Sequence, residues 1–187
     1  MRSHKFVLSQ TYLYVVRMPT DAELTFADHA GRFYARRYGF PPMVGRLLGY
    51  LTVCDPINPT IADLADALLA SRSAIAGAVK NLEAMRLVQR TRAAGERSDR
   101  VQIDLSSPHA TGLDPAEYTE VGELAREGLE MLAGLAPERR AVLSEMAAFS
   151  DFLVEQIPLL GQRWEQRRAE LVAAGELLPR PSTGGRR

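Results

Sequence analysis

Hydroxyl and basic side chains gather in the stretch SRSAIAGAVKNLEAMR, residues 71–86. Ile75, Val79 and Leu82 recur at helical spacing, so the stretch predicts a helix with one apolar side. Its polar side carries Ser71, Arg72, Ser73 and Lys80. Hydroxyls near a helix N-terminus and long cations bind phosphate oxygens, because the helix dipole favours an anion there. The chemistry that these residues offer is hydrogen bonding and charge neutralisation at a polyanion.

The charged residues of the chain are unevenly distributed, and the same region is basic. Residues 71–100 carry seven basic side chains against three acidic ones, a net charge of +4. Residues 114–170 carry twelve acids against six arginines, a net charge of −6, although the whole 187-residue chain is formally neutral. Such a split indicates a basic surface that faces a polyanion.

The exposed side of the 71–86 helix is small, since Ser73, Ala76 and Gly77 occupy it. The major groove of B-DNA is about 12 Å wide, so a helix that enters it must bring its backbone close to base edges and phosphates. Small side chains permit that approach. The alternative is that the same small face packs against another helix inside a core.

Two predicted helices precede this segment. Asp21 is placed to cap a first helix, which Gly39 ends. Pro41-Pro42 suit the first turn of a second helix. The apolar stripe of this second helix consists of Val44, Leu47, Leu48 and Leu51.

A helix-turn-helix pattern follows. Thr60 and Asp63, three residues apart, predict a capping box for a short helix. After a turn at Leu69-Ala70, Ser71 is placed to cap the 71–86 helix. The order of short helix, tight turn and second helix is typical of DNA-binding proteins.

Two β-like runs, residues 87–91 and 101–105, come next and predict a hairpin with Gly95 in its turn. The hairpin places Arg97 at or near its tip, and Arg92 and Arg100 on its strands. A narrow minor groove concentrates negative potential, so these three arginines are predicted DNA contacts.

Residues 113–174 are a predicted helical dimerisation region. Asp114-Pro115 begin one helix, and Pro137 begins a longer one that Pro158 should kink or divide. The first of these helices has Tyr118, Val121, Leu124 and Leu132 on one side. In the last helix, apolar residues lie close to a heptad seam and exceed what one peripheral helix can hide. They are the predicted dimerisation residues, Val142, Met146, Phe149, Leu153 and Leu160.

The predicted fold class is therefore mainly α with a small β-hairpin wing. Residues 21–107 form a winged helix-turn-helix DNA-binding domain with leading helices, and residues 113–174 form the dimerisation region. Residues 1–20 are predicted to be an N-terminal extension, for which Met18 is an alternative translation start, and residues 175–187 are predicted to be a disordered tail.

The sequence also resembles the GbsR-type branch of the MarR family of regulators, over roughly residues 22–105. The resemblance rests on GFPPMVGRLLGYL, residues 39–51, on IADLADALLASRSAIAGAVKNLEAMRLVQR, and on the GER of the wing. It implies a homodimeric, ligand-responsive bacterial transcription factor whose terminal helices form the dimer interface. It implies DNA contacts at Ser71, Arg72, Ser73, Lys80 and Arg97. Ala76-Gly77 and Met85-Arg86 depart from the pattern of the family, which leaves the operator sequence open.

Aromatic residues suggest a place for a small-molecule effector. Some relatives of this type are thought to sense quaternary-amine osmolytes, for which an aromatic cage is the expected chemistry. The predicted effector-pocket residues are Phe26, Phe33, Tyr34, Tyr50 and Phe149. Their helical spacing favours the alternative that most of them pack in the core.

Other kinds of site are not expected. Cys54 follows an apolar helix and has no basic neighbour, so an inert buried thiol is favoured over a redox switch. The three histidines lack the spacing of metal ligands, so we expect neither metal nor cofactor. The sequence contains no motif of a nucleophile elbow or phosphate loop, so an enzyme is not expected. No segment reaches the roughly 18 apolar residues that span a bilayer, which predicts a cytoplasmic protein without a membrane partner.

Together these features predict a ligand-responsive transcriptional regulator, a repressor, that binds a palindromic operator in double-stranded DNA as a homodimer. The alternative is a winged-helix module that binds another protein and has no sequence-specific affinity for DNA. Salt dependence separates the two, because phosphate contacts weaken steeply between about 50 and 200 mM salt.

Overall fold

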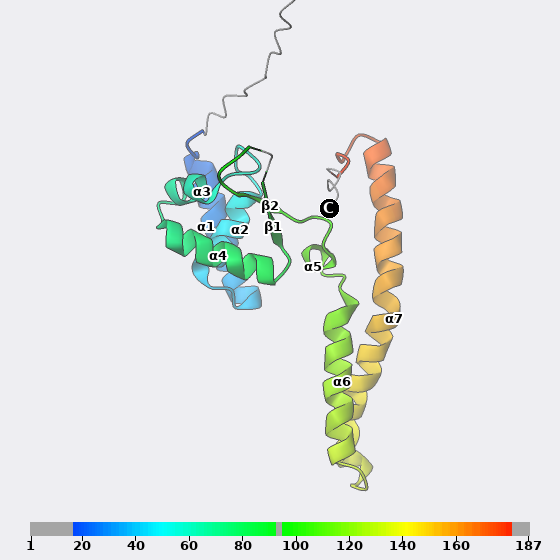
Figure 1. The fold of residues 1–187 in the computed structure, drawn as a ribbon. Coiled ribbons are helices and arrows are strands. Elements are labelled where there is room, and N and C mark those ends of the chain that lie inside the picture. The colour runs from blue at the N-terminus through cyan, green and yellow to red at the C-terminus, as the bar shows by residue number, and fades with distance from the viewer. Residues whose placement is uncertain (1–16, 93–94, 181–187) are drawn as a thin grey trace, which may run out of the picture. The chain divides into compact units, whose positions relative to one another are not determined.

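The computed structural model describes residues 17–92 and 95–180. It is mainly helical with one β-hairpin, as predicted (Figure 1). The chain divides into two compact units. The first unit holds the residues up to Ala84 together with Val88–Ile103, and the second holds Met85–Leu87 and the chain from Asp104 onward. Most of the predicted N-terminal extension and the end of the predicted tail lie outside the described residues.

The first unit begins with helix α1, Asp21–Tyr38. Its cap is Thr20 and not Asp21 as predicted, because the Thr20 hydroxyl accepts a hydrogen bond from the Glu23 amide and the Glu23 carboxylate accepts one from the Thr20 amide. This reciprocal pair is a capping box, which satisfies two amides at the helix start. At the other end Gly39 has φ +69°, the left-handed conformation that ends the helix as predicted.

Helix α2, Pro42–Leu51, crosses α1 at close range. The predicted stripe of α2 is buried, with Leu47 fully inaccessible to solvent. Two glycines allow the close crossing. A Cβ on Gly49 would lie 2.3 Å from the Cβ of Ala30, and a Cβ on Gly45 would lie 3.2 Å from the backbone of Gly31. The backbones of α1 and α2 therefore approach more closely than ordinary side chains permit.

Helices α3, Ile61–Ala67, and α4, Arg72–Ala84, form the predicted helix-turn-helix. The Thr60 and Asp63 capping box is confirmed, with amide bonds of 2.8 and 3.2 Å. The Ser71 hydroxyl accepts a hydrogen bond of 3.1 Å from the Ala74 amide, which confirms it as the cap of α4. The apolar side of α4 enters the core of the unit, where Ile75, Val79 and Leu82 are fully buried.

Strands β1, Val88–Thr91, and β2, Arg100–Ile103, pair antiparallel and form the wing. The pairs run from Val88 with Ile103 to Thr91 with Arg100. The wing is also tied to the start of the helix-turn-helix. Thr60 forms a β-bridge with Arg100, and the Val101 amide donates to the Pro59 carbonyl at 2.9 Å.

The second unit consists of α5, Pro108–Thr111, α6, Pro115–Met131, and α7, Pro137–Ala173. The four-residue α5 was not predicted, because one turn is too short to show a period. The starts of α6 and α7 are as predicted, with Asp114 accepting a hydrogen bond from the Ala116 amide. Helix α7 continues through Pro158, so of the two predicted outcomes the division is wrong and the kink stays a prediction. A proline inside a helix removes a single backbone hydrogen bond, a loss that need not end a helix as long as this one.

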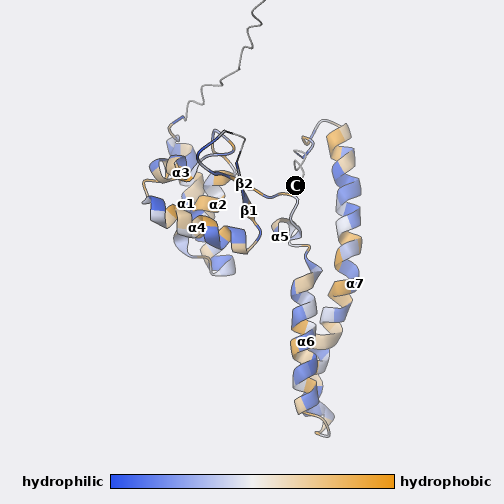
Figure 2. Ribbon diagram, viewed as in Figure 1, coloured by the Kyte–Doolittle hydropathy of each residue, from blue (hydrophilic) through white to orange (hydrophobic). Residues whose placement is uncertain are grey.

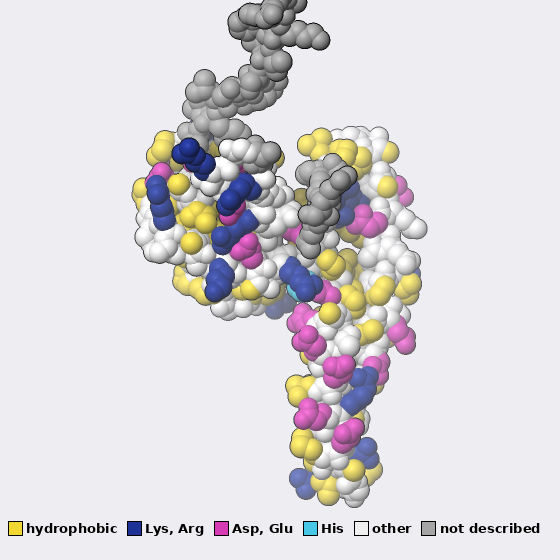
Figure 3. Space-filling model, viewed as in Figure 1, with side chains coloured by type: hydrophobic (Ala, Val, Ile, Leu, Met, Phe, Trp, Pro, Cys, Tyr) yellow, Lys and Arg dark blue, Asp and Glu magenta, His cyan; other side chains and the backbone are white. Residues whose placement is uncertain are grey.

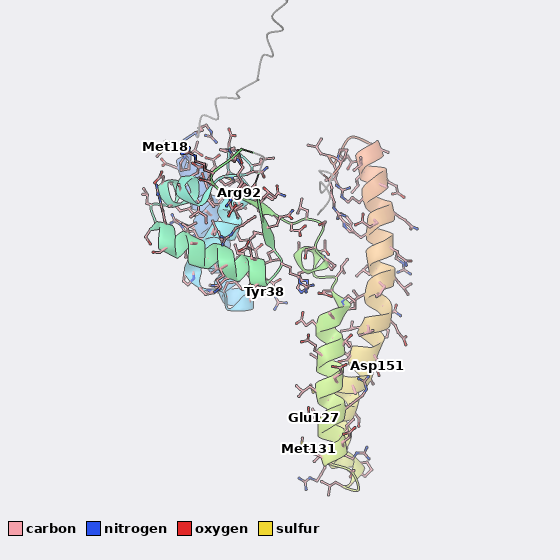
Figure 4. The ribbon with its side chains drawn as sticks, viewed as in Figure 1. Met18, Tyr38, Arg92, Glu127, Met131 and Asp151 are labelled. Atoms are coloured by element: carbon pink, nitrogen blue, oxygen red, sulfur yellow. The ribbon has the colours of Figure 1, made fainter. Side chains whose placement is uncertain are left out.

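Helices α6 and α7 pack against each other through small residues. Gly122, Ala125 and Gly128 are the buried residues of α6. A Cβ on Gly122 would lie 3.1 Å from the Cβ of Ser150, and a Cβ on Gly128 would lie 2.7 Å from a methyl group of Leu143, both on α7. An ion pair joins Arg126 of α6 to Asp151 of α7, the latter labelled in Figure 4. The side of α6 predicted to carry Tyr118, Val121, Leu124 and Leu132 is not the side buried in this contact, since Leu124 is 65% exposed. The small residues bring the two backbones together, and the larger apolar side chains remain outside.

Candidate nucleic-acid interface

The exposed side of α4 carries the predicted contact residues. Ser71, Arg72, Ser73, Gly77 and Lys80 are all exposed, and Ala76 is half-buried. A Cβ added to Gly77 would meet no atom within 4 Å, so the backbone is open to an approaching partner there. The alternative prediction, that this small face packs inside a core, is wrong within the described residues.

The first turn of α4 presents two hydroxyls together. The oxygens of Ser71 and Ser73 lie 3.0 Å apart, and Ser71 already accepts a hydrogen bond from the Ala74 amide. Ser73 therefore stands beside the cap, where helix amides and dipole favour an anion. Arg72, between the two serines, adds a cation to the same turn. This turn has the composition of a phosphate-binding site.

The three predicted arginines of the wing differ in what they contact. Arg92, which follows β1 and is labelled in Figure 4, forms an ion pair of 2.7 Å with Asp99. The hydrogen bond from Arg92 lowers the pKa of the Asp99 carboxyl. Arg97 is exposed and forms no ion pair with any other described residue. Arg97 is therefore the wing arginine most accessible to a polyanion.

Arg100 lies inward. Its guanidinium donates to the Glu96 carboxylate at 2.9 Å and to the Asn58 carbonyl at 3.0 Å, and its side chain is only 21% exposed. Arg100 thus links the wing to the loop before α3. The prediction that Arg100 contacts DNA stays a prediction, but its contacts in the structure suit a residue that positions the wing.

Arg46 on α2 supports the helix-turn-helix, although no pattern in the sequence indicates this role. Its guanidinium donates to the Leu68 carbonyl at 2.8 Å and to the Asp28 carboxylate at 2.6 Å. Leu68 ends α3, so Arg46 fixes the turn that leads to α4. Only the crossing of α1 and α2 brings these three residues together, which is why spacing along the chain does not reveal them.

The predicted effector aromatics do not form one cluster in the first unit. Phe33 and Tyr34 meet edge to face at 5.2 Å, whereas Tyr50 is 4% exposed and belongs to the core. Burial raises the pKa of the Tyr50 hydroxyl. Phe26 is half exposed on α1, and Phe149 belongs to the second unit. The effector pocket stays a prediction.

A cavity of about 160 Å³ lies within the second unit. Its walls come from the segment around α5, from α7 and from Arg180, and include Pro108, Leu113 and Trp164. None of the predicted effector residues lines this cavity.

The thiol of Cys54 is 6% exposed. Burial raises its pKa from 9.0 to about 11, so the reactive thiolate is rare at neutral pH. These values favour the inert thiol over the redox switch.

Among the described residues there is no group of three side chains that could hold a metal ion. Nor is any helix in the described parts of the chain long and apolar enough to cross a membrane.

Charge and hydropathy differ between the units. On the face shown in Figure 3, Lys and Arg side chains are prominent over the first unit, whereas Asp and Glu side chains recur along α6 and the part of α7 beside it. Apolar residues recur along both long helices (Figure 2). Among the predicted dimerisation residues, Val142 is 71% exposed, Phe149 59% and Leu160 52%. Leu153 is half-buried.

Comparison with known families places these elements. A family model described as the MarR family matches residues 38–97, which include α2, the helix-turn-helix and β1. A second, described as an MmpR5-like MarR family transcriptional regulator, matches residues 110–167, which cover α6 and most of α7. Both models describe MarR-family proteins, and they match one segment in each unit of the chain. The chain is thus similar to transcriptional regulators of the MarR family, and these relatives are not enzymes.

Individual proteins of this kind are similar to the chain as well. The chain is 28% identical over 151 residues to the HTH-type transcriptional regulator MmpR5 of Mycobacterium tuberculosis, which covers 79% of this chain and 89% of the relative. A crystal structure described as that of a transcriptional regulator is similar with a TM-score of 0.71 and 27% identity, over 78% of this chain and 99% of the other. The predicted winged helix-turn-helix fold is confirmed. The GbsR-type branch is not among these relatives and stays a prediction.

Proposed function

We propose that this MarR-family regulator is a homodimeric repressor that binds a palindromic operator and responds to a small molecule. The observation that carries the proposal is the exposed side of α4, where two serine hydroxyls, Arg72 and Lys80 surround a backbone left open at Gly77. Arg97 adds an exposed cation on the wing. Each protomer would insert its α4 into a major groove, and the two half-sites would lie about 10 base pairs apart.

The second unit supports the dimer. Helices α6 and α7 leave large apolar side chains outside their mutual contact, and exposed apolar surface of this extent marks an interface. A ligand would act by changing the spacing of the two α4 helices in the dimer, so that one population of dimers fits the operator and the other does not.

The contact surface is tested by gel-shift titration on the upstream region of the gene. We expect the double variant Arg72→Ala/Arg97→Ala to lose about tenfold or more in affinity and to show a shallower salt slope, because each lost phosphate contact lowers that slope by about 1. The matched control is Arg139→Ala/Arg163→Ala, which removes two exposed arginines from α7. Equal affinity of the first variant and the wild type contradicts the assigned surface.

If the wild type binds no DNA fragment even at low salt, the alternative holds, and the winged helix binds another protein. The GbsR-type resemblance is part of the proposal and has its own test. Selection of DNA from a random pool is repeated with choline or another quaternary amine present, and a shift in binding supports that branch.

A further inference from the structure

Leu69, in the turn between α3 and α4, has a left-handed backbone with φ +51°. The Ala70 amide donates to the Ala65 carbonyl at 3.0 Å, and the Leu69 amide donates to the Asp66 carbonyl at 3.4 Å. These two bonds define a Schellman motif, whose left-handed position usually holds glycine because a Cβ there crowds the backbone. Leu69 thus places a large side chain at a position where the backbone conformation favours glycine.

The surrounding structure holds the turn in this conformation. Arg46 donates to the Leu68 carbonyl at 2.8 Å, directly before Leu69, and Asp28 holds Arg46 at 2.6 Å. The Ser71 hydroxyl caps α4 two residues after Leu69. A sparsely populated backbone conformation persists when its neighbours determine it in this way, and such positions gather at functional sites.

The side chain of Leu69 contributes little to the core, since it is 86% exposed. Packing within the first unit therefore offsets little of the cost of the left-handed backbone. The turn also places Leu69 next to the phosphate-binding features of α4, namely Ser71 and Arg72. An exposed apolar group beside hydroxyls and a cation suits a partner that offers both phosphates and apolar carbons.

We propose that Leu69 is a DNA contact, and that its side chain packs on apolar carbon of the operator beside the first turn of α4. This inference rests on the proposed function. DNA offers such carbon in two places, the C5-methyl group of thymine in the major groove and the deoxyribose of the backbone. The contact adds affinity at the edge of the site, where α4 itself has few long side chains.

The test compares Leu69→Gly and Leu69→Ala with the wild type on a duplex selected by the full-length protein. We expect both variants to bind roughly three- to tenfold more weakly, because both lose the apolar contact. Only Leu69→Gly should raise the melting temperature, since alanine keeps the Cβ that crowds the turn. Leu178→Ala is the control: it removes a leucine that is 84% exposed in the second unit and should leave affinity unchanged.

Replacing the thymines of the duplex with deoxyuridine identifies the carbon that Leu69 contacts. If it is a thymine methyl, the replacement weakens the wild type and removes the difference from Leu69→Ala. If it is deoxyribose, the difference persists on both duplexes. Wild-type affinity in both Leu69 variants overturns this inference and leaves the proposed function standing, whereas a wild type that binds no duplex at low salt overturns both.

Discussion

At Gly77, glycine lowers the stability of α4 but favours the proposed approach of α4 to DNA. Glycine inside a helix costs stability relative to alanine, because it loses more backbone freedom on folding. Gly77 faces open space, so packing within the unit does not require it. An approaching backbone or base edge would require it.

We therefore expect Gly77→Ala to stabilise the protein by about 0.5–1 kcal/mol in urea unfolding. The same variant should bind operator DNA more weakly, because the new methyl group stands between the helix and the groove. Gly161→Ala in α7 is the matched control, since its Cβ also meets nothing within 4 Å. Gly161→Ala should gain stability and keep the wild-type affinity for DNA. If Gly77→Ala also keeps the wild-type affinity, the proposed role of Gly77 is contradicted.

Cys54 gives a prediction on pH. Because the pKa of its thiol is raised from 9.0 to about 11, the folded state binds a proton that the unfolded state has already released between these values. The free energy of unfolding should therefore be unaffected by this group below pH 9 and should fall as pH rises toward 11. Cys54→Ser should flatten that part of the profile. Rapid alkylation of the native wild type by iodoacetamide at pH 8 would show that the thiol is not protected.

The role of a single residue could be predicted from the sequence where it depends on residues close by in the chain. The caps at Thr60 and Ser71 follow from local hydrogen bonds, and both were predicted. Arg92 and Arg100 were not predicted to pair with acids. Their partners depend on the register of the hairpin, which sets Thr91 opposite Arg100 and which no local pattern fixes.

At the scale of elements, the crossing of α1 and α2 depends on glycine. Gly49→Ala would bring a methyl group to within 2.3 Å of the Ala30 Cβ, and neither atom is the end of a flexible side chain. We expect a loss of about 1–3 kcal/mol in the free energy of unfolding, since overpacking forces the helices apart. Chemical denaturation measures it. A variant as stable as the wild type would mean that the helices can separate at no cost.

The wing gives a second prediction at this scale. Asp99 holds Arg92, and its pKa is lowered by that contact, so the carboxylate stays charged until the pH falls below its ordinary range. Asp99→Asn should release Arg92 toward phosphate, tighten DNA binding and steepen the salt slope by about 1. If affinity and slope stay at the wild-type values, Arg92 does not contact DNA.

Whole elements were predictable where an apolar stripe has a clear period. Helices α1, α2 and α4 were predicted within a few residues of their ends. The side of α6 that contacts α7 was not predicted, because its buried residues are Gly122, Ala125 and Gly128, which are too small to count as an apolar stripe. Periodicity reveals a hydrophobic face but not whether that face meets the neighbouring helix or a second molecule.

At the scale of the whole molecule, the exposed apolar side of α7 is the proposed interface between two protomers. Val142 and Phe149 contribute little to the fold of one chain, being 71% and 59% exposed. We expect Val142→Glu/Phe149→Glu to sediment as a monomer at concentrations where the wild type is a dimer, and to retain its helical circular dichroism. Two buried glutamates facing their copies cannot be desolvated cheaply.

Gln156→Glu/Gln162→Glu is the control for this charge change, because both glutamines are exposed polar residues of α7. This variant should remain a dimer. A wild type that sediments as a monomer, or a dimer that persists with glutamate at positions 142 and 149, would remove this face from the interface.

The tie between the wing and the loop before α3 has a consequence for regulation. Because Thr60 bridges to Arg100 and the Val101 amide bonds to Pro59, the hairpin cannot swing without breaking hydrogen bonds at the foot of the helix-turn-helix. These bonds hold the wing and the helix-turn-helix together as one rigid domain, in which the distance between α4 and the wing is fixed. In the proposed dimer, an effector would therefore act on the separation between the two winged helix-turn-helix domains and not on the distance between α4 and the wing within one of them.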